Sequence, residues 1–253
     1  MAKGFKEPNN TNSNLIIGRN PVTEALKSGR AIDKIMVSGE EGSVKVIVAK
    51  ARERGIPVMK AERSALDRLA GGQPHQGVAA YVSSYSYSTV EDILGAAAKK
   101  GEDPFIIILD GIEDPHNLGA VIRTADCAGA HGVIIPKRYS AGLTDTVAKA
   151  SAGAIEYVPV ARVANIAQTI DTLKEKGIWV YACDMDGELY TRQDMKGKLA
   201  LVIGSEGFGI SRLVKEKCDF TVSIPMRGHV NSLNASNAAC AVMYEVRRQR
   251  DLG

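Results

Sequence analysis

The chain has 253 residues, of which 45% are hydrophobic and 24% are charged, and its formal net charge is +3. These values are ordinary for a soluble globular protein of one large domain or two small ones. No apolar run approaches the roughly 20 residues of a membrane-spanning helix, so we expect no membrane partner. Residues 1–14 are polar and lack the apolar segment of a secretory signal, which predicts a disordered tail.

Residues 15–83 predict a small α/β domain, because short apolar strands alternate there with helical segments. The first helix is expected to have Asn20 as its N-cap and Pro21 at its first helical position. A later helix is expected to end at Gly55. After a first short strand, the expected strands lie at 32–37, 56–60 and 75–83.

The segment 84–103 has weak periodicity and several helix-breaking residues, which predicts a linker with one short helix. Charge also differs between the two halves of the chain. Residues 1–100 hold 15 Lys and Arg against 10 Asp and Glu (+5), whereas residues 101–253 hold 17 against 19 (−2). A basic N-terminal half suggests a polyanionic partner, and a solvated charged surface is the simpler alternative.

Residues 104–253 predict a second α/β domain. Its short, continuously apolar strands alternate with helices, which is typical of a parallel sheet covered on both faces. Ligands of such sheets bind beyond the carboxyl ends of the strands. We therefore expect a site in the loops after Leu109, Ile203 and Ile224. The predicted strands lie at 105–109, 133–135, 155–160, 178–183, 199–203 and 220–224.

The first loop places Asn117 where a helix N-cap is expected. In the helix that follows, Arg123 lies ~140–160° away from Leu118 and Ala125, two members of the predicted buried stripe, at about 100° per residue. Arg123 therefore faces off the core, as a ligand-contacting arginine must. The alternative is a surface arginine on an amphipathic helix.

The second loop carries Gly204, Gly207 and Gly209, which permit unusual backbone conformations and a close approach to a ligand. Glu206 at the loop tip is a candidate acid, base or orienting group, although the loop could be only a tight turn. Ser211 is expected to cap the next helix. The glycine spacing matches neither the dinucleotide fingerprint nor the P-loop, so a nicotinamide oxidoreductase is not supported.

The third loop joins a strand to a helix rich in small residues and crowds polar side chains between them. Such side chains need partners if they are buried, and a ligand with several polar groups or a partner subunit could supply them. The polar residues are Arg227, His229, Asn231, Ser232, Asn234, Ser236 and Asn237.

Cysteine spacing predicts a reducing compartment. No C-x-x-C pair is present, and each cysteine lies in or beside an apolar segment, which favours buried free thiols and a cytoplasmic location. These residues are Cys127, Cys183, Cys218 and Cys240.

Three stretches, NLGAVIRTADCAGAHGV, IGSEGFGIS and IPMRGHVNSLNASNAA, resemble in order and spacing the three motifs of the SpoU (TrmH-type) RNA ribose methyltransferases. Two others, IIGRNPVTEALKSGRAIDKIMVS and HQGVAAYV, resemble the N-terminal substrate-recognition domain of the subgroup that methylates large-subunit ribosomal RNA. The resemblance covers nearly the whole chain after the tail.

This resemblance implies methyl transfer from S-adenosylmethionine to a ribose 2′-hydroxyl, with a guanosine of large-subunit ribosomal RNA as the favoured target. It also implies a SPOUT-type α/β domain with a deep trefoil knot, an exception to the rule that folds are unknotted, and a homodimer with the site near the subunit interface. The implied cofactor contacts are Gly204, Ile224 and Leu233. The implied catalytic positions are Asn117, Arg123, Glu206, Ser232 and Asn234.

No metal is expected, because the methyl donor already carries its leaving group. The protein must mainly align the hydroxyl oxygen with the methyl carbon at ~3–3.5 Å. Arg123 is often proposed as the proton acceptor in this family, but a guanidinium stays protonated in ordinary surroundings. We expect Arg123 to clamp a phosphate or the developing oxyanion, and Glu206 to accept or orient the proton.

Two other functions remain open at this point. Methylation of transfer RNA is the same chemistry on another substrate, and the N-terminal domain argues against it. A non-catalytic RNA-binding factor for ribosome assembly is the second, and the presence of Arg123, Glu206 and Asn234 argues against it.

Overall fold

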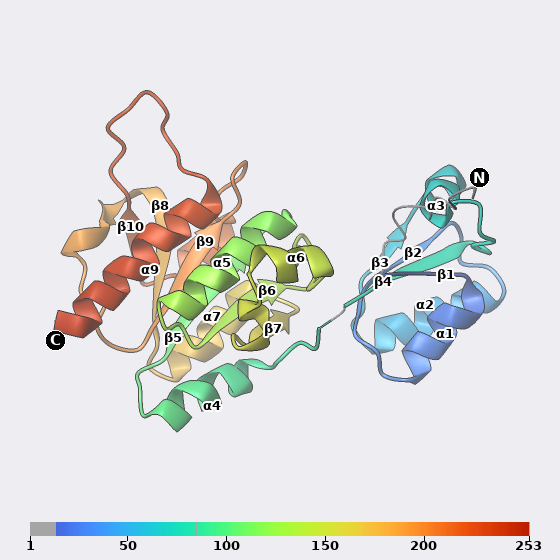
Figure 1. The fold of residues 1–253 in the computed structure, drawn as a ribbon, viewed down its shortest axis with the longest axis horizontal. Helices are drawn as coiled ribbons and strands as arrows, with labels where there is room; N and C mark the ends of the chain where they lie inside the picture. Colours follow the sequence, from blue (N-terminus) through green and yellow to red (C-terminus); the bar gives the residue numbers. More distant parts are fainter. Residues whose placement is uncertain (1–13, 84, 253) are drawn as a thin grey trace, which may run out of the picture. The chain divides into compact units, whose positions relative to one another are not determined.

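The computed structural model describes residues 14–83 and 85–252. The predicted tail, residues 1–14, lies outside the described residues except for Asn14, whose carbonyl accepts a hydrogen bond from the Val82 amide at 2.8 Å. The chain divides into two compact units, residues 1–85 and 86–253. Figure 1 draws the elements of both units.

The first unit is a four-stranded sheet with three helices. In chain order its elements are β1 (Leu15–Ile17), α1 (Arg19–Lys27), β2 (Ile32–Val37), α2 (Ser43–Glu53), β3 (Val58–Lys60), α3 (Arg63–Ala70) and β4 (Val78–Val82). The strand order is β1-β4-β2-β3, and only the β2–β3 pair is parallel. Apolar residues from α1 and α2, such as Val22 and Ile47, form the core with Ile35 and Val78 of the sheet.

Helix α1 begins one residue before the predicted cap. Gly18 is the N-cap with a φ of 96°, so the prediction of Asn20 as the cap is wrong. The Gly18 amide donates to the carbonyl of Val78 at 3.0 Å, which fixes this turn to the sheet. A φ of this sign suits glycine, because it has no Cβ. The expected end of α2 is confirmed, since Gly55 follows it with a φ of 62°.

The second unit is a six-stranded sheet with helices on both faces (Figure 1). The strand order is β10-β8-β9-β5-β6-β7, and every pairing is parallel, as the apolar strands predict. The strands are β5 (Phe105–Asp110), β6 (Gly132–Pro136), β7 (Val160–Val163), β8 (Trp179–Leu189), β9 (Leu199–Gly204) and β10 (Phe220–Ser223).

The helices of the second unit form two layers (Figure 1). Helices α4 (Val90–Lys100), α7 (Ile166–Glu175) and α8 (Arg212–Lys217) bury side chains in one core cluster against the sheet. On the other face, α5 (Pro115–Cys127) packs against α6 (Asp145–Ala150) and against α9 (Ala235–Leu252). Two short 3-10 helices, η1 (Ala154–Glu156) and η2 (Tyr190–Arg192), complete the unit.

The segment predicted as a linker, 84–103, is mostly packed into the second unit. Helix α4 occupies most of it, and Ile93 is fully buried in a core shared with Ile106 and Ile134. Ser88 also forms an isolated parallel bridge with Ala161. Residues 86–103 therefore belong to the second unit by their packing.

The strand predicted at 155–160 is wrong over its first residues, because they form η1. The amides of Glu156 and Tyr157 donate to carbonyls three residues earlier, at 3.1 and 3.0 Å, and β7 begins only at Val160. Ile155 is buried while η1 packs against α5. A short apolar run cannot by itself distinguish a strand from a buried helical turn.

Candidate active site

Three loops meet near the carboxyl ends of the parallel strands. Strands β5 and β9 are direct neighbours, and Asp110 pairs with Gly204 where they end. Strand β10 is separated from β9 only by β8. The loops β5–α5, β9–α8 and β10–α9 therefore leave the same edge of the sheet, where ligands of parallel sheets bind.

Side chains from all three loops converge on the carboxylate of Glu206. The amide nitrogen of Asn117 donates to Glu206 Oε1 at 3.1 Å. The amide nitrogen of Asn234 donates to the same oxygen and also to Asn117 Oδ1, the latter at 2.9 Å. The backbone amide of Ala235 lies 3.4 Å from this oxygen as a further donor. We call Asn117, Glu206 and Asn234 the carboxylate cluster; all three are among the catalytic positions that the family resemblance implies.

Helix α5 presents Asn117 from its first turn. The predicted role of Asn117 as N-cap is wrong, because Asp114 is the cap and its side chain accepts a hydrogen bond from the His116 amide at 2.9 Å. Pro115 occupies the first helical position, which suits a residue without an amide hydrogen. With capping supplied by Asp114, the Asn117 side chain is available to reach across to Glu206.

A tight backbone hairpin carries Glu206. Ser205 and Gly209 exchange both backbone hydrogen bonds, at 3.1 and 2.9 Å, so Glu206 projects from the closed end. Gly204 at its base has no room for a side chain, since a Cβ there would lie 2.1 Å from the carbonyl carbon of Gly209 and 2.3 Å from the Ile210 nitrogen. This contact explains why a glycine stands at the end of β9.

The oxygen and the nitrogen of the Asn234 side-chain amide have different hydrogen-bond partners. Its Oδ1 accepts hydrogen bonds from the backbone amides of Ser236 and Asn237, at 2.9 and 3.3 Å, which caps α9. Its Nδ2 donates into the carboxylate cluster. Only a side chain with both an acceptor and a donor can do this, so the network fixes the orientation of the amide.

A cleft of about 450 Å³ opens beside the cluster. All three predicted cofactor contacts, Gly204, Ile224 and Leu233, line it together with Glu206 and Ser232. Its volume falls within the range of small-molecule sites, ~300–1,000 Å³. Ile224 and Leu233 give part of the lining an apolar surface, while Glu206 and Ser232 add polar groups, a mixture that suits an adenosyl group. The residues present therefore fit a nucleoside-type cofactor.

Arg123 lies outside the carboxylate cluster. The predicted buried stripe of α5 is confirmed, since Leu118 and Ala125 are fully buried while Arg123 is exposed. No hydrogen bond or ion pair joins its guanidinium to another residue of the described chain. Arg123 follows Asn117 by six positions, or about 9 Å along the helix axis. The fold leaves this arginine available to a ligand.

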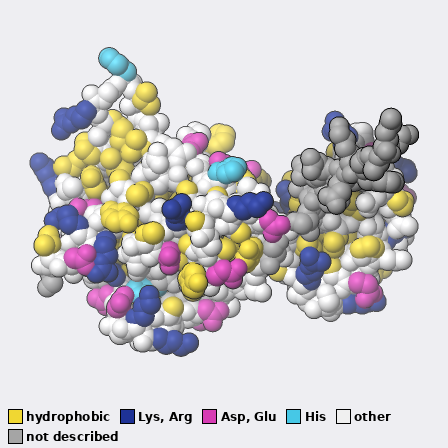
Figure 2. All heavy atoms as spheres, in the orientation of Figure 1, with side chains coloured by type: hydrophobic (Ala, Val, Ile, Leu, Met, Phe, Trp, Pro, Cys, Tyr) yellow, Lys and Arg dark blue, Asp and Glu magenta, His cyan; other side chains and the backbone are white. Residues whose placement is uncertain are grey.

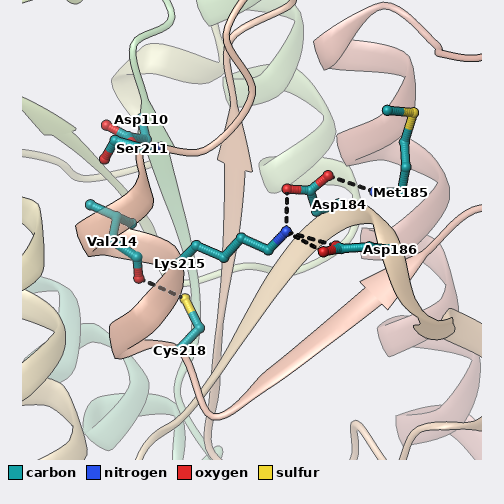
Figure 3. A network of polar contacts seen from close by, with 8 residues as sticks. All are labelled: Asp110, Asp184, Met185, Asp186, Ser211, Val214, Lys215 and Cys218. Atoms are coloured by element: carbon teal, nitrogen blue, oxygen red, sulfur yellow. Dashed lines mark hydrogen bonds and ion pairs between the residues drawn. The ribbon is translucent and has the colours of Figure 1, made fainter.

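Several polar contacts behind the cleft were not predicted from the sequence. Asp110 accepts a hydrogen bond from the Ser211 amide at 2.7 Å, which ties the end of β5 to the start of α8. Ser211 is the N-cap of α8, as predicted, but its side chain makes no capping hydrogen bond. Lys215 bonds to Asp184 and Asp186 of β8 (Figure 3). The available signal was the pair of carboxylates, Asp184 and Asp186, directly after the strand predicted at 178–183.

The thiols are less uniform than predicted. All four cysteines are free, but Cys127 is exposed and the other three are only partly buried. Cys183 lines the cleft, and burial together with the charge of Asp184 raises its pKa to about 11. Burial likewise raises the pKa of Cys218 to about 12, with a contribution from Asp219. Neither thiol is a thiolate at neutral pH, so neither is a nucleophile in this site.

Within residues 14–83 and 85–252, no set of three or more His, Cys, Asp and Glu side chains is arranged to hold a metal ion. In the same part of the chain, no helix combines the length and apolar character needed to cross a membrane.

Comparison with known proteins follows the same division of the chain. Residues 104–244 match the SpoU rRNA Methylase family, and residues 15–88 match the family described as RNA 2'-O ribose methyltransferase substrate binding. A putative TrmH family tRNA/rRNA methyltransferase of Bacillus subtilis (strain 168), YacO, is 51% identical over 239 residues, which cover 93% of this chain and 96% of that protein.

Two solved structures extend the comparison. The SpoU methyltransferase AviRb from Streptomyces viridochromogenes, in complex with AdoMet, aligns with a TM-score of 0.61 and 28% identity, over 94% of this chain and 91% of that one. An AdoMet-bound rRNA methyltransferase from Sinorhizobium meliloti aligns with a TM-score of 0.57 and 26% identity, over 92% and 86%.

The parallel sheet and its glycine-rich carboxyl edge define a methyltransferase domain of the SPOUT type, joined to a substrate-binding domain. The chain belongs to the SpoU family, which confirms the expectation from its motifs. It is an RNA 2′-O-ribose methyltransferase of this family and uses S-adenosylmethionine.

Proposed function

We propose that this chain methylates the ribose 2′-hydroxyl of a guanosine in large-subunit ribosomal RNA. The observation that carries the proposal is the carboxylate cluster standing beside a cleft lined by Gly204, Ile224 and Leu233. The choice of ribosomal RNA rests on the two-domain organisation, because the rRNA methyltransferase of Sinorhizobium meliloti aligns over 92% of this chain. In our proposal the protein acts in the cytoplasm, and its second unit contains a trefoil knot.

The cleft is the proposed cofactor site. When bound, S-adenosylmethionine supplies a methyl group on a sulfonium, which is already activated for transfer. Ile224 and Leu233 offer apolar contact to it, and Gly204 lets backbone form the base of the cleft. The chain's part is to hold the cofactor and the ribose in line at ~3–3.5 Å, which by itself lowers the barrier substantially.

Glu206 is the proposed proton acceptor or orienting group for the ribose hydroxyl. Asn117 and Asn234 donate to one of its two carboxylate oxygens, Oε1, and so fix the plane of the group. Asn117 and Asn234 both donate to Oε1 and not to the second oxygen, Oε2, which leaves Oε2 available to a hydroxyl. Ser232 lines the same cleft, and we expect it to contact the ribose. This arrangement prepares an acceptor before the substrate binds.

Arg123 is the proposed clamp on the substrate phosphate or on the developing oxyanion. Its guanidinium is exposed and offers five N–H donors in a planar fork, which matches a phosphate group. In this role Arg123 stabilises negative charge, and the proton is left to Glu206.

We also propose a homodimer, because the face that carries α9 and the β10–α9 loop exposes apolar side chains (Figure 2). In a single chain Val230 is 71% exposed, Leu233 42% and Tyr244 48%. The loop itself projects from the sheet (Figure 1). Covering these side chains with a second copy would complete the cofactor cleft at Leu233. Sedimentation of the full chain tests this, and a monomer at micromolar concentration would contradict it.

RNA recognition is assigned to the first unit. Residues 1–85 hold 13 Lys and Arg against 8 Asp and Glu, a net charge of +5. We expect a fragment of residues 86–253 to bind S-adenosylmethionine but to bind RNA at least tenfold more weakly, because phosphate contacts supply much of RNA affinity. Calorimetry and gel shift measure the two affinities. Undiminished RNA binding by the fragment would contradict the assignment.

The experiment that tests the target is a map of 2′-O-methyl groups in RNA from cells with and without the gene. The proposal expects one large-subunit guanosine to lose its methyl group in the deletion strain. Loss of a transfer RNA methyl group, with ribosomal RNA unchanged, would favour the alternative substrate. Unchanged methylation in both, with a defect in subunit assembly, would favour a non-catalytic role.

A further inference from the structure

Strand β8 leaves its pairing with β10 for five residues beside the cleft. Ala182 pairs with Thr221 of β10, but the next residue of β10, Val222, pairs with Glu188. Residues 183–187 are therefore unpaired with β10, although Cys183 still pairs with Ile203 of β9, and we call these five residues the excursion. Cys183, Asp184 and Met185 of this excursion line the same cleft as Gly204 and Leu233, so the excursion forms one of its walls.

The far end of the excursion is fixed by backbone packing. A Cβ at Gly187 would lie 2.5 Å from both the carbonyl carbon of Thr221 and the nitrogen of Val222, so the two strands touch here. The hydroxyl of Ser223 also donates to the Gly187 carbonyl at 2.8 Å. These contacts hold Gly187 but do not reach Asp184 and Met185.

Lys215 holds the rest of the excursion (Figure 3). Its ammonium lies 2.8 Å from Asp184 Oδ2 and 2.7 and 2.8 Å from the two carboxylate oxygens of Asp186. The other oxygen of Asp184 accepts a hydrogen bond from the Met185 amide at 2.7 Å. Lys215 and Asp184 are largely screened, with 28% and 26% of their side chains exposed.

The charges of Lys215 and Asp186 are stable near neutral pH. Burial acts to lower the pKa of Lys215, but its hydrogen bonds to Asp184 and Asp186 outweigh that effect and the net shift is upward. The hydrogen bond from Lys215 lowers the pKa of Asp186. Both shifts favour the charged forms of Lys215 and Asp186, so this ion pair persists at neutral pH.

Helix α8 connects Lys215 and its two aspartates to the opposite wall of the cleft, which the glycine-rich loop forms. It follows directly on the hairpin that carries Glu206, and its first residues are tied to β5 through the Ser211 amide and Asp110. A side chain from α8 that grips the excursion therefore sets the spacing between the 183–187 wall and the glycine-loop wall.

We propose that Lys215 is a positioning residue for the cofactor, which holds the 183–187 wall of the cleft in place through Asp184 and Asp186. This inference rests on the proposed function, in which the cleft binds S-adenosylmethionine. Lys215 does not itself line that cleft among the described residues, so it acts through the wall and does not take part in the chemistry.

The test compares Lys215→Met with Lys217→Met in the full chain. Lys217 is a matched control, since it lies on the same helix and pairs with Asp171 at 2.9 Å, with the two side chains 41% and 45% exposed. Calorimetry should give about tenfold weaker S-adenosylmethionine binding for Lys215→Met, as expected from the loss of a charge-assisted bond, and less than twofold for Lys217→Met.

A double-mutant cycle sharpens the test. Asp186→Asn should reproduce much of the loss, and the double variant Lys215→Met/Asp186→Asn should lose little more, because both changes release one wall. Lys215→Arg should restore most of the affinity. In steady state the KM for S-adenosylmethionine should rise while kcat at saturation stays within twofold of wild type.

Each outcome has one interpretation. Wild-type affinity in Lys215→Met, or a fall in kcat with KM unchanged, would overturn the positioning role. Equal loss of affinity in Lys215→Met and Lys217→Met would also overturn it, because the effect would then be a general one of helix α8. A wild-type chain that does not bind S-adenosylmethionine would instead overturn the proposed function, and this would be seen before any variant is compared.

Discussion

Glu206 and Arg123, two charged residues of the proposed site, are held in opposite ways. Glu206 accepts hydrogen bonds from Asn117 and Asn234, and its hairpin is closed by two backbone bonds. Arg123 stands exposed on α5, and no ion pair restrains it within the described chain. Folding therefore fixes Glu206 of the proposed site, whereas Arg123 is left to be held by a ligand.

This difference suggests different roles for Glu206 and Arg123 in the reaction. A carboxylate that is already oriented requires little reorganisation when the ribose arrives, which is how preorganised groups lower a barrier. A free guanidinium loses side-chain entropy on binding, ~2 kcal/mol for a long side chain, and that cost is offset only by a strong charge-assisted contact. A phosphate supplies such a contact.

The largest effect is expected from Arg123→Ala. Turnover should fall by about 100- to 1,000-fold, the usual cost of removing a group that stabilises developing charge. Cofactor affinity and melting temperature should stay unchanged, because the side chain supports neither the cleft nor the core. Single-turnover methylation, calorimetry and thermal unfolding measure the three quantities.

Arg123→Lys separates the contribution of the planar guanidinium to turnover from that of its positive charge. If the planar fork grips the phosphate, lysine should be nearly as inactive as alanine. A lysine variant close to the wild-type rate would remove the bidentate clamp from the account. A drop in melting temperature in Arg123→Ala would show instead that the residue serves the fold.

A somewhat smaller effect is expected from Asn234→Asp, about 100-fold in turnover. The change keeps the Oδ1 that caps α9 but replaces the donor with a charge against Glu206. Asn234→Ala should cost less, about tenfold, because it removes the donor without adding repulsion. Asn237→Asp is the matched control, since it adds the same charge in the same helical turn, where the helix dipole favours it.

The two possible roles of Asn234, as a helix cap and as a member of the carboxylate cluster, predict different turnover for these variants. If Asn234 only capped α9, aspartate would be tolerated, because both residues are good caps. Wild-type turnover in Asn234→Asp would therefore remove Asn234 from the catalytic set. Equal damage from Asn237→Asp would trace the effect to charge at the helix end and not to Glu206.

The smallest expected effect is that of Gly204→Ala on stability, about 1–3 kcal/mol in the free energy of unfolding, as for other overpacked sites. A Cβ there would meet the backbone of Gly209 and Ile210 at 2.1 and 2.3 Å. Gly207→Ala is the control, because its Cβ would meet no atom within 4 Å. Denaturant unfolding should separate the two, and equal stability would refute the close approach.

The sequence could predict features that depend on period and order. The 3.6-residue stripe of α5 identified Leu118 as buried and Arg123 as exposed, and both are confirmed. The apolar strands indicated a parallel sheet, and strand order along the chain indicated which loops would share an edge. These inferences need only local geometry.

Features that depend on contacts between distant residues could not be derived in this way. Asn117 was predicted as a helix cap, because Asn is a good cap, but the Asp114-Pro115 pair begins the helix earlier and leaves Asn117 to bind Glu206. The grip of Lys215 on Asp184 spans 31 residues and depends on an irregular strand pairing that periodicity does not reveal.

The measurement that tests the central claim most directly is nucleoside analysis of ribosomal RNA after a single turnover with labelled S-adenosylmethionine. We predict that the label appears only as a 2′-O-methylated ribonucleoside, and that Arg123→Ala forms almost none of it while binding the cofactor normally. Label on a base, or full transfer by Arg123→Ala, would contradict the account of a prepared carboxylate that works with a ligand-held arginine.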